Sequence, residues 1–186
     1  MRRLRRRAAL GLTLLLTLSA CARDPVLVDG EWHSERAGFR IGVPAAAVGN
    51  PDDPDPPAQW ERFDLDGALL AYRRDARETL SLQARCGRPV AEPAIMARQL
   101  LIGIPERTLR EGGPREIAGR SGWLQTFDAR LDGRMVRIKT MTLVSGGCAY
   151  DLVLVAEGDS EPAERVFDAW VDTFALTRGD VAEGTP

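Results

Sequence analysis

The sequence has one histidine and one lysine, Lys139, and it lacks both a Cys-x-x-Cys pair and a glycine-rich phosphate-binding loop. A metal site built from several histidines is therefore excluded. The absence of Gly-x-x-x-x-Gly-Lys-Ser/Thr and Gly-x-Gly-x-x-Gly argues against nucleotide-dependent chemistry, and the absence of His-Glu-x-x-His argues against a zinc protease. We therefore expect no cofactor and no catalytic residues.

The first twenty residues have the pattern of a secretory signal peptide. Five arginines precede an uninterrupted run of apolar or small residues from Ala8 to Leu18, which is the order of a charged n-region and an apolar h-region. This eleven-residue run covers roughly half of a hydrocarbon core about 30 Å thick, too little for a spanning helix. We expect residues 1–20 to be removed on export.

The segment Leu18-Ser19-Ala20-Cys21 resembles the lipobox of bacterial lipoproteins, an aliphatic residue and two small residues before a cysteine. The resemblance implies that Cys21 is acylated, palmitate included, and holds the chain on a membrane. Ala22 stands where aspartate retains enteric-type lipoproteins in the inner membrane. We therefore expect the lipid to hold the chain at the periplasmic face of the outer membrane. The alternative is a chance cysteine beside an ordinary cleavage site.

The charge of the exported chain argues against nucleic acid as a partner. Residues 1–20 hold five of the 25 basic residues and none of the 27 acidic residues, so the mature chain carries 20 basic groups and a net charge of −7. Nucleic-acid-binding proteins carry the opposite charge.

Two cysteines remain if the lipid occupies Cys21. Cys86 and Cys148 would meet an oxidising compartment, where a disulfide is expected. In the chain-entropy model such a bridge stabilises the fold by roughly 4 kcal/mol. Two buried free thiols and redox chemistry are the alternatives, and redox chemistry is disfavoured by the absence of a Cys-x-x-Cys spacing.

The patterning divides the mature chain into a tether, one domain and a tail. We expect a tether over 21–36, a single domain over 37–177 and a flexible acidic tail over 178–186. Four prolines and three aspartates in residues 49–57 predict a stiff exposed loop, because proline interrupts both helices and strand ladders.

The domain begins with strand patterns. Phe39 to Val43 alternates in polarity, and residues 60–86 predict a three-stranded meander with a turn at Asp66-Gly67. A first helix is predicted from Pro93 to Ile104, where apolar residues recur at helical spacing before Pro105.

A second half rich in strands follows, with hairpin turns at Asp132-Gly133 and at residues 145–147 between strands that begin at Arg115. The apolar run Cys148–Ala156 predicts a central strand covered on both faces. A helix after Ser160 carries one apolar stripe that ends at Phe174, which should lie across the sheet.

The fold class is therefore α+β, an antiparallel sheet of about six to eight strands covered by at least two helices. The order of elements resembles the PsbP-like fold, in the segments Gly38–Pro44, Ile117–Trp123, Cys148–Val155 and Val171–Leu176. The resemblance covers Gly38 to Leu176 and implies a scaffold used for binding or assembly, usually without chemistry.

Few residues of the sequence are candidates for catalysis or metal binding. His33 lies in the expected tether, where an exposed linker residue is the simplest interpretation. Gly119-Arg-Ser-Gly-Trp123 fails as a serine-hydrolase elbow because tryptophan replaces the last glycine. The proline-rich loop with Asp52, Asp53 and Asp55 lacks the curvature and the bidentate glutamate of a calcium loop.

Two groups of residues stay open as ligand or catalytic candidates. Carboxylates such as Asp128 and Asp151 would be catalytic only if the fold brought them together. Four aromatic residues could line a ligand groove, although core packing explains each position; they are Trp60, Trp123, Trp170 and Tyr150.

These observations favour a non-catalytic envelope lipoprotein, an accessory or binding component of an envelope assembly or transport system. The alternatives are a periplasmic carrier of a small apolar ligand or lipid, and a hydrolase with an unrecognised carboxylate site. A large apolar pocket would favour the carrier, whereas a filled core with an exposed apolar patch would favour binding to an envelope protein.

Overall fold

The computed structural model of the chain describes residues 24–45, 59–87, 90–104, 106–158 and 160–177. The signal peptide, Cys21, the proline-rich loop and the acidic tail that the sequence predicts lie outside the described residues. No helix of the described part is long and apolar enough to cross a membrane.

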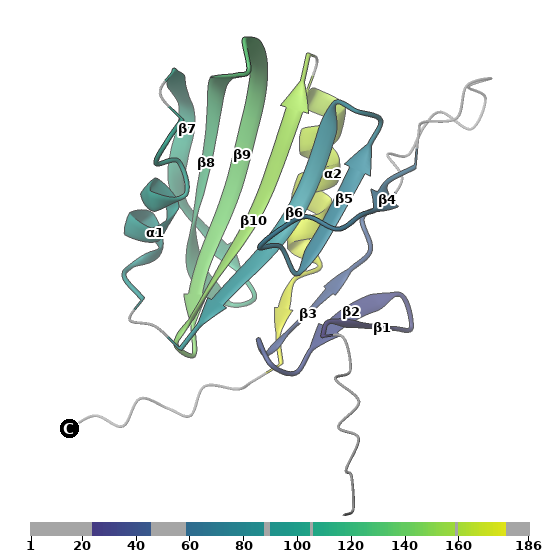
Figure 1. Cartoon of the computed structure of the whole chain (residues 1–186). Helices are drawn as coiled ribbons and strands as arrows, with labels where there is room; N and C mark the ends of the chain where they lie inside the picture. The colour runs from purple at the N-terminus through teal and green to yellow at the C-terminus, as the bar shows by residue number, and fades with distance from the viewer. Residues whose placement is uncertain (1–23, 46–58, 88–89, 105, 159, 178–186) are drawn as a thin grey trace, which may run out of the picture.

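A seven-stranded antiparallel sheet dominates the structure (Figure 1), with strand order β4-β5-β6-β10-β9-β8-β7. The central strand is β10, which pairs with β6 and β9 as the apolar run after Cys148 predicted. The strands are β4 (Glu61–Arg62), β5 (Leu70–Arg74), β6 (Glu78–Cys86), β7 (Arg107–Ile117), β8 (Arg120–Leu131), β9 (Arg134–Ser145) and β10 (Cys148–Glu157).

Tight turns fix the register of the long hairpins. Asp132 and Gly133 both have positive φ, 49° and 80°, the backbone that a two-residue hairpin turn requires. Leu131 consequently pairs with Arg134, and each later residue of β9 has a defined partner on β8. The turn that the sequence predicted at this position is confirmed.

A second, four-stranded antiparallel sheet packs beside the large one. Its order is β1-β2-β3-β11, with β1 (Val26–Val28), β2 (Glu31–Ser34), β3 (Phe39–Gly42) and β11 (Ala175–Leu176). Strands β1 and β2 fall within the segment that we expected to be a tether. They form a hairpin that pairs with β3, so the folded part of the chain reaches beyond the expected boundary at residue 37.

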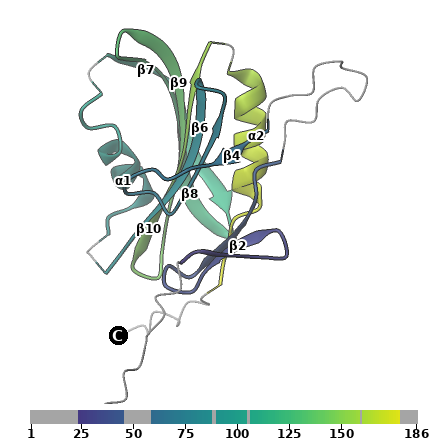
Figure 2. The ribbon, with the colours of Figure 1, turned by 45° about the vertical axis from the view of Figure 1, so that its right-hand side comes forward.

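The two helices lie on opposite faces of the large sheet (Figure 2). Helix α2 (Glu161–Asp172) buries its apolar stripe as predicted, whereas α1 (Pro93–Gln99) is shorter than predicted. The main core fills the α2 face and joins both sheets. Its aromatic centre includes Phe39, stacked on Phe174 at 5.7 Å between ring centroids, and Trp170, whose Nε1 donates to Gly42 O.

The α+β class and the antiparallel sheet are confirmed, but the expectation of one sheet was incomplete. The described residues form eleven strands in two sheets with two helices. Strand β7 begins at Arg107, although we expected no strand before Arg115. Residues 107–113 lack alternation, and their extended conformation comes from pairing with β8, a tertiary interaction that overrides weak local preference.

Candidate functional site

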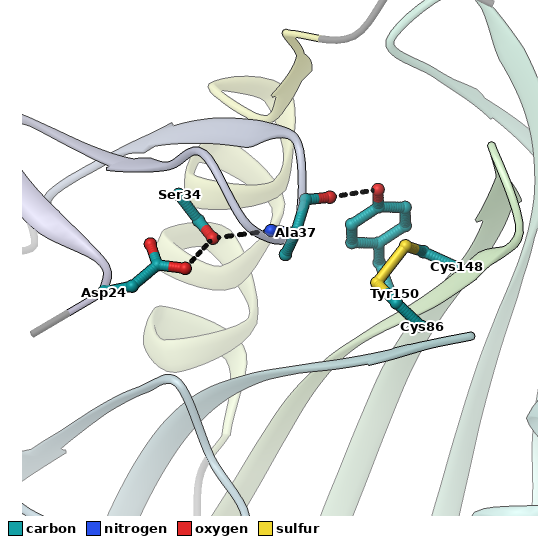
Figure 3. Close-up of a disulfide and its surroundings, with 6 residues drawn as sticks. All are labelled: Asp24, Ser34, Ala37, Cys86, Cys148 and Tyr150. Carbon is teal, nitrogen blue, oxygen red and sulfur yellow. Dashed lines mark hydrogen bonds between the residues drawn. A yellow bond between two sulfur atoms is a disulfide. The ribbon is translucent and has the colours of Figure 1, made fainter. Parts of the chain in front are cut away.

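The disulfide joins Cys86, the last residue of β6, to Cys148, the first residue of β10. The two residues are directly opposite in the ladder, with their Cα atoms 4.1 Å apart. The bridge therefore closes the end of the central strand pair (Figure 3), as the cysteine count predicted. It covalently joins two interior strands of the large sheet at one end of their ladder.

Hydrogen bonds link the N-terminal end of the domain to Tyr150 of β10, two residues after Cys148 (Figure 3). The Ser34 hydroxyl donates to Asp24 Oδ2 at 2.9 Å and accepts from the backbone N–H of Ala37 at 3.0 Å. The Tyr150 hydroxyl donates to the carbonyl oxygen of Ala37 at 2.6 Å. Asp24 is thereby fixed to the domain.

The carboxylates Asp128 and Asp151 lie on opposite faces of the sheet. Asp128 belongs to the α2 face, where Arg137 bonds both Asp128 and Glu164 of α2. Asp151 belongs to the α1 face, beside Val153, which packs in the core cluster under α1. The two groups cannot act on one bond, so the carboxylate pair that the sequence left open is not assembled.

The two faces shift the pKa of these carboxyl groups in opposite directions. Burial raises the pKa of Asp151, although Arg85 bonds Oδ2 at 2.6 Å and Thr142 bonds Oδ1 at 2.9 Å. Burial also opposes ionisation of Asp128, but hydrogen bonds from Arg137 and Arg110 outweigh it and lower the pKa of Asp128. Desolvation thus prevails on the α1 face and ion pairing on the α2 face.

The other candidate chemical residues have structural explanations. His33 lies in β2, with Nε2 3.6 Å from Glu31. In the failed elbow motif, Gly119 has φ 71° in the β7–β8 turn, and a Cβ on Gly122 would stand 2.8 Å from Thr142 O. No cluster of three metal-ligating side chains occurs among the residues that the structure describes.

Three of the four aromatic candidates are core residues, and the fourth lines a groove. Trp60, Trp170 and Tyr150 are buried in the main core. Trp123 is half-buried on the α1 face and borders a cavity of about 250 Å³ between α1, β7 and β8. We call this cavity the α1 groove. Its walls are Arg98, Leu101, Arg107, Leu109, Gly112, Trp123, Gln125 and Phe127.

The α1 groove is apolar inside and basic at its rim. The buried Gln125 amide ties β8 to α1 by donating to Ala97 O at 2.8 Å. Arg107 holds the end of the helical segment by donating to Leu101 O and Ile104 O. The exposed side chain of Arg98 has no hydrogen bond or ion pair within the described part of the chain. A free guanidinium therefore stands beside an apolar cavity in an acidic protein.

Two exposed apolar residues belong to the groove or follow it in the chain: Leu109 is one of its walls, and Ile102 follows the wall residue Leu101. Ile102, just after α1, is 78% exposed, and Leu109 on β7 is 59% exposed. Sequence reasoning singled out Trp123 but missed Arg98 and Arg107, because only strand pairing from Arg107 onward brings them beside Trp123.

The comparisons with known proteins give the fold. No protein-family model and no curated protein sequence matches the chain. Among solved structures, cyanobacterial PsbP from Synechocystis sp. PCC 6803 matches with a TM-score of 0.54 and 12% identity, over 78% of this chain and 91% of that protein.

Two further structures match with lower scores. LpqN, involved in cell envelope biogenesis of Mycobacterium tuberculosis, has a TM-score of 0.48 and 19% identity, over 69% of this chain and 88% of that one. The Ran-binding protein Mog1p of Saccharomyces cerevisiae has a TM-score of 0.49 and 10% identity, over 75% of this chain and 90% of that one. With both TM-scores under 0.5, neither likeness bears on the function of this chain. The fold, by its element order and its likeness to cyanobacterial PsbP, is PsbP-like.

Proposed function

We propose that this chain is a non-catalytic lipoprotein of the bacterial cell envelope, held by the lipid on Cys21 at the periplasmic face of the outer membrane. In this proposal the PsbP-like domain is an accessory component of an envelope assembly or transport system. It binds an apolar segment of a partner protein in the α1 groove, with an acidic residue of that segment beside Arg98.

The observation that carries this proposal is the combination of a filled main core with an open apolar groove. The α2 face has its apolar side chains packed around Phe39 and Trp170. On the α1 face, by contrast, apolar side chains stay exposed: Leu109 lines the groove, and Ile102 follows the groove residue Leu101 in the chain. Interfaces have such an apolar centre with a polar rim.

The size of the α1 groove argues against the alternative that the protein carries a small apolar ligand. Pockets for drug-sized ligands measure roughly 300–1,000 Å³ and enclose most of the ligand surface. The α1 groove measures about 250 Å³ and lies open beside the exposed Leu109. The larger cavity of about 460 Å³ near β4 and β5 has polar walls that include Glu61, Arg73 and Asp75. A protein segment that lies across the groove fits the exposed flanks better than an engulfed lipid.

Charge supports an acidic partner segment. The mature chain is acidic overall, yet the groove wall carries Arg98 and Arg107 and no carboxylate. Arg107 is engaged with backbone carbonyls, which leaves the guanidinium of Arg98 for a ligand. An arginine recognises a carboxylate with two parallel hydrogen bonds.

The test of the groove is site-specific photocrosslinking in the intact envelope. A photoreactive side chain at Ile102 should capture a protein, whereas the same side chain at Met135 should capture none. Met135 is the matched control because it is 55% exposed and precedes Val136, whose side chain faces α1, so it points to the other face. The crosslinked partner segment should contain apolar residues and an acidic residue.

A synthetic peptide of that segment should then bind the purified domain, and Arg98→Glu should weaken the binding at low salt more than at high salt. If Ile102 crosslinked to lipid and to no protein, the result would favour the alternative, in which the protein carries a small apolar ligand or lipid. Equal crosslinking at Ile102 and Met135 would refute the groove as a binding site.

The proposed lipidation of Cys21 has a separate test. Cys21→Ala should leave an uncleaved precursor without acyl chains, detected by mass spectrometry and by loss of incorporated labelled palmitate. Normal processing and labelling of the variant would refute the lipoprotein assignment and would leave the groove experiment unaffected.

A further inference from the structure

The small sheet carries a second exposed apolar surface, far from the α1 groove (Figure 1). All three residues of the edge strand β1 are about half exposed, Val26 at 49%, Leu27 at 51% and Val28 at 47%. Val43, just after β3, is also exposed, and its N–H donates to the carbonyl oxygen of Gly30 in the β1–β2 turn. Val26 and Val28 lie on one face of β1 and Leu27 on the other, so the exposed apolar side chains line both sides of this edge of the small sheet. We call the edge with these four residues the β1 patch.

The β1 patch lies very close along the chain to the predicted lipid. Ser34, itself buried, fixes Asp24 to the domain through its hydroxyl group (Figure 3). Only residues 22 and 23 separate Cys21 from this fixed point, and a chain of three residue steps spans at most about 11 Å. The expected sixteen-residue tether is thus shortened to a link that cannot hold the domain away from a membrane.

The charges around the β1 patch do not select an anionic surface. The carboxylate of Glu31 on β2 is paired with Arg40 on β3 at 3.0 Å and lies 3.6 Å from His33. Asp29 stands in the β1–β2 turn and adds a negative charge. Contact with a bilayer would therefore depend on the apolar side chains entering the headgroup region, as in other interfacial anchors.

We infer that the β1 patch rests on the surface of the bilayer that holds the Cys21 lipid, and that it fixes the orientation of the whole domain on the membrane. The inference rests on the lipidation of Cys21 in the proposed function. It adds a second membrane contact to the acyl chains and leaves the α1 groove, at the other side of the sheet, turned to the periplasm. A lone acyl anchor would leave the domain free to rotate.

The test is an environment-sensitive dye at position 27 of the lipidated protein in phosphatidylcholine vesicles. Leu27→Cys supplies the only free thiol when Cys21 is acylated and Cys86 and Cys148 are bridged. The matched control is Ile102→Cys, at an exposed apolar residue beside the groove. The dye at 27 should shift its emission to the blue in vesicles and lose intensity with brominated lipid, whereas the dye at 102 should do neither.

Three outcomes would overturn the inference. Equal emission at 27 and 102, in protein that mass spectrometry shows to be lipidated and that floats with vesicles, would refute the membrane contact alone. An unmodified Cys21 would remove the anchor and refute both this inference and the lipoprotein assignment, but not the proposed binding at the α1 groove. A blue shift that grows with protein concentration without vesicles would assign the β1 patch to a second copy of the chain.

A second measurement covers the possibility that the dye distorts the hairpin. In the wild-type lipidated protein, the amides of residues 26–28 should exchange hydrogen more slowly in vesicles than after the vesicles are dissolved in detergent. The amides around Ile102 should exchange equally in both conditions. Equal rates at residues 26–28 would count against the inference.

Discussion

The two faces of the large sheet are covered in different ways. A twelve-residue helix, α2, closes one face over an aromatic core, and ion pairs such as Lys139 with Asp168 at 2.8 Å join its polar side to β9. A seven-residue helix, α1, covers only part of the other face. There Asp151 is buried, the hydroxyl of Thr140 has no partner among the described residues, and the α1 groove stays open. The α2 face is closed over the main core, whereas part of the α1 face stays uncovered.

Replacing a tryptophan on each face should show this difference most strongly. Trp170→Ala removes a fully buried side chain and its hydrogen bond to Gly42, which should lower the free energy of unfolding by about 3–5 kcal/mol. Trp123→Ala removes a half-buried side chain from the groove wall and should cost about 1 kcal/mol. Urea denaturation of both variants measures the two losses. Equal losses would contradict the division of roles between the faces.

The disulfide should contribute the next largest effect. A Cys86→Ser/Cys148→Ser variant loses the bridge between β6 and β10 and should lose roughly 2–4 kcal/mol of unfolding free energy. Neither cysteine lines the α1 groove. Crosslinking at the groove should therefore persist as long as the variant stays folded. Denaturation with and without reductant gives the same quantity in the wild type, and an unchanged midpoint after reduction would contradict the prediction.

The carboxyl groups of Asp151 and Asp128 should give stability slopes of opposite sign against pH. The pKa of Asp151 is raised above its ordinary 3.8, so the native state keeps a proton that the unfolded chain has lost. Stability from this group therefore falls as pH rises from that value through the raised pKa. The pKa of Asp128 is lowered below 3.8, so its contribution is present above that value and is lost as pH falls through the lowered pKa.

Amide variants separate the two slopes. Asp151→Asn should remove the decline in stability at rising pH, and Asp128→Asn should remove the decline at falling pH. Denaturation curves from about pH 3 to pH 7 measure both. If the two variants changed the pH profile of stability in the same direction, the opposite pKa shifts of Asp151 and Asp128 would be contradicted.

The smallest effect on stability should come from the groove rim. Arg98 is exposed and has no partner among the described residues, so Arg98→Glu should change the free energy of unfolding by less than about 0.5 kcal/mol. The same substitution should weaken capture of the partner segment. Arg165→Glu on α2 is the control for binding: this residue is also an exposed helical arginine, although it pairs with Glu161 at 2.6 Å, so its substitution should affect stability and not capture. A loss of stability with unchanged binding would show that Arg98 is structural.

Local sequence signals predicted the elements that depend on neighbours in the chain. The turn at Asp132-Gly133, the central strand after Cys148 and the apolar stripe of α2 appear where the pattern indicated. The elements that sequence reasoning missed depend on distant partners. Strands β1 and β2 form because Trp32 packs in the main core and β2 pairs with β3, contacts that no periodicity over a few residues can announce.

The candidate site was predictable only in part. The pair Cys86 and Cys148 followed from counting cysteines, and Trp123 was one of four aromatic residues that could face a ligand. Nothing near Arg98 or Arg107 distinguished them from the other arginines of an arginine-rich chain. Their placement depends on where α1 ends and on the pairing of β7 with β8.

The α+β class and the disulfide pair could be predicted from the sequence, because each follows from period or number along the chain; the export signal and the lipid site stay predictions from the order of residues. The tertiary structure was needed to show that Asp128 and Asp151 face opposite ways, that three of the four aromatic candidates fill the core, and that residues 26–34 of the expected tether form a hairpin. The physical reason is that burial is a property of the assembled sheet. Which face a side chain meets, and how much of that face a helix covers, depend on contacts between residues far apart in the chain.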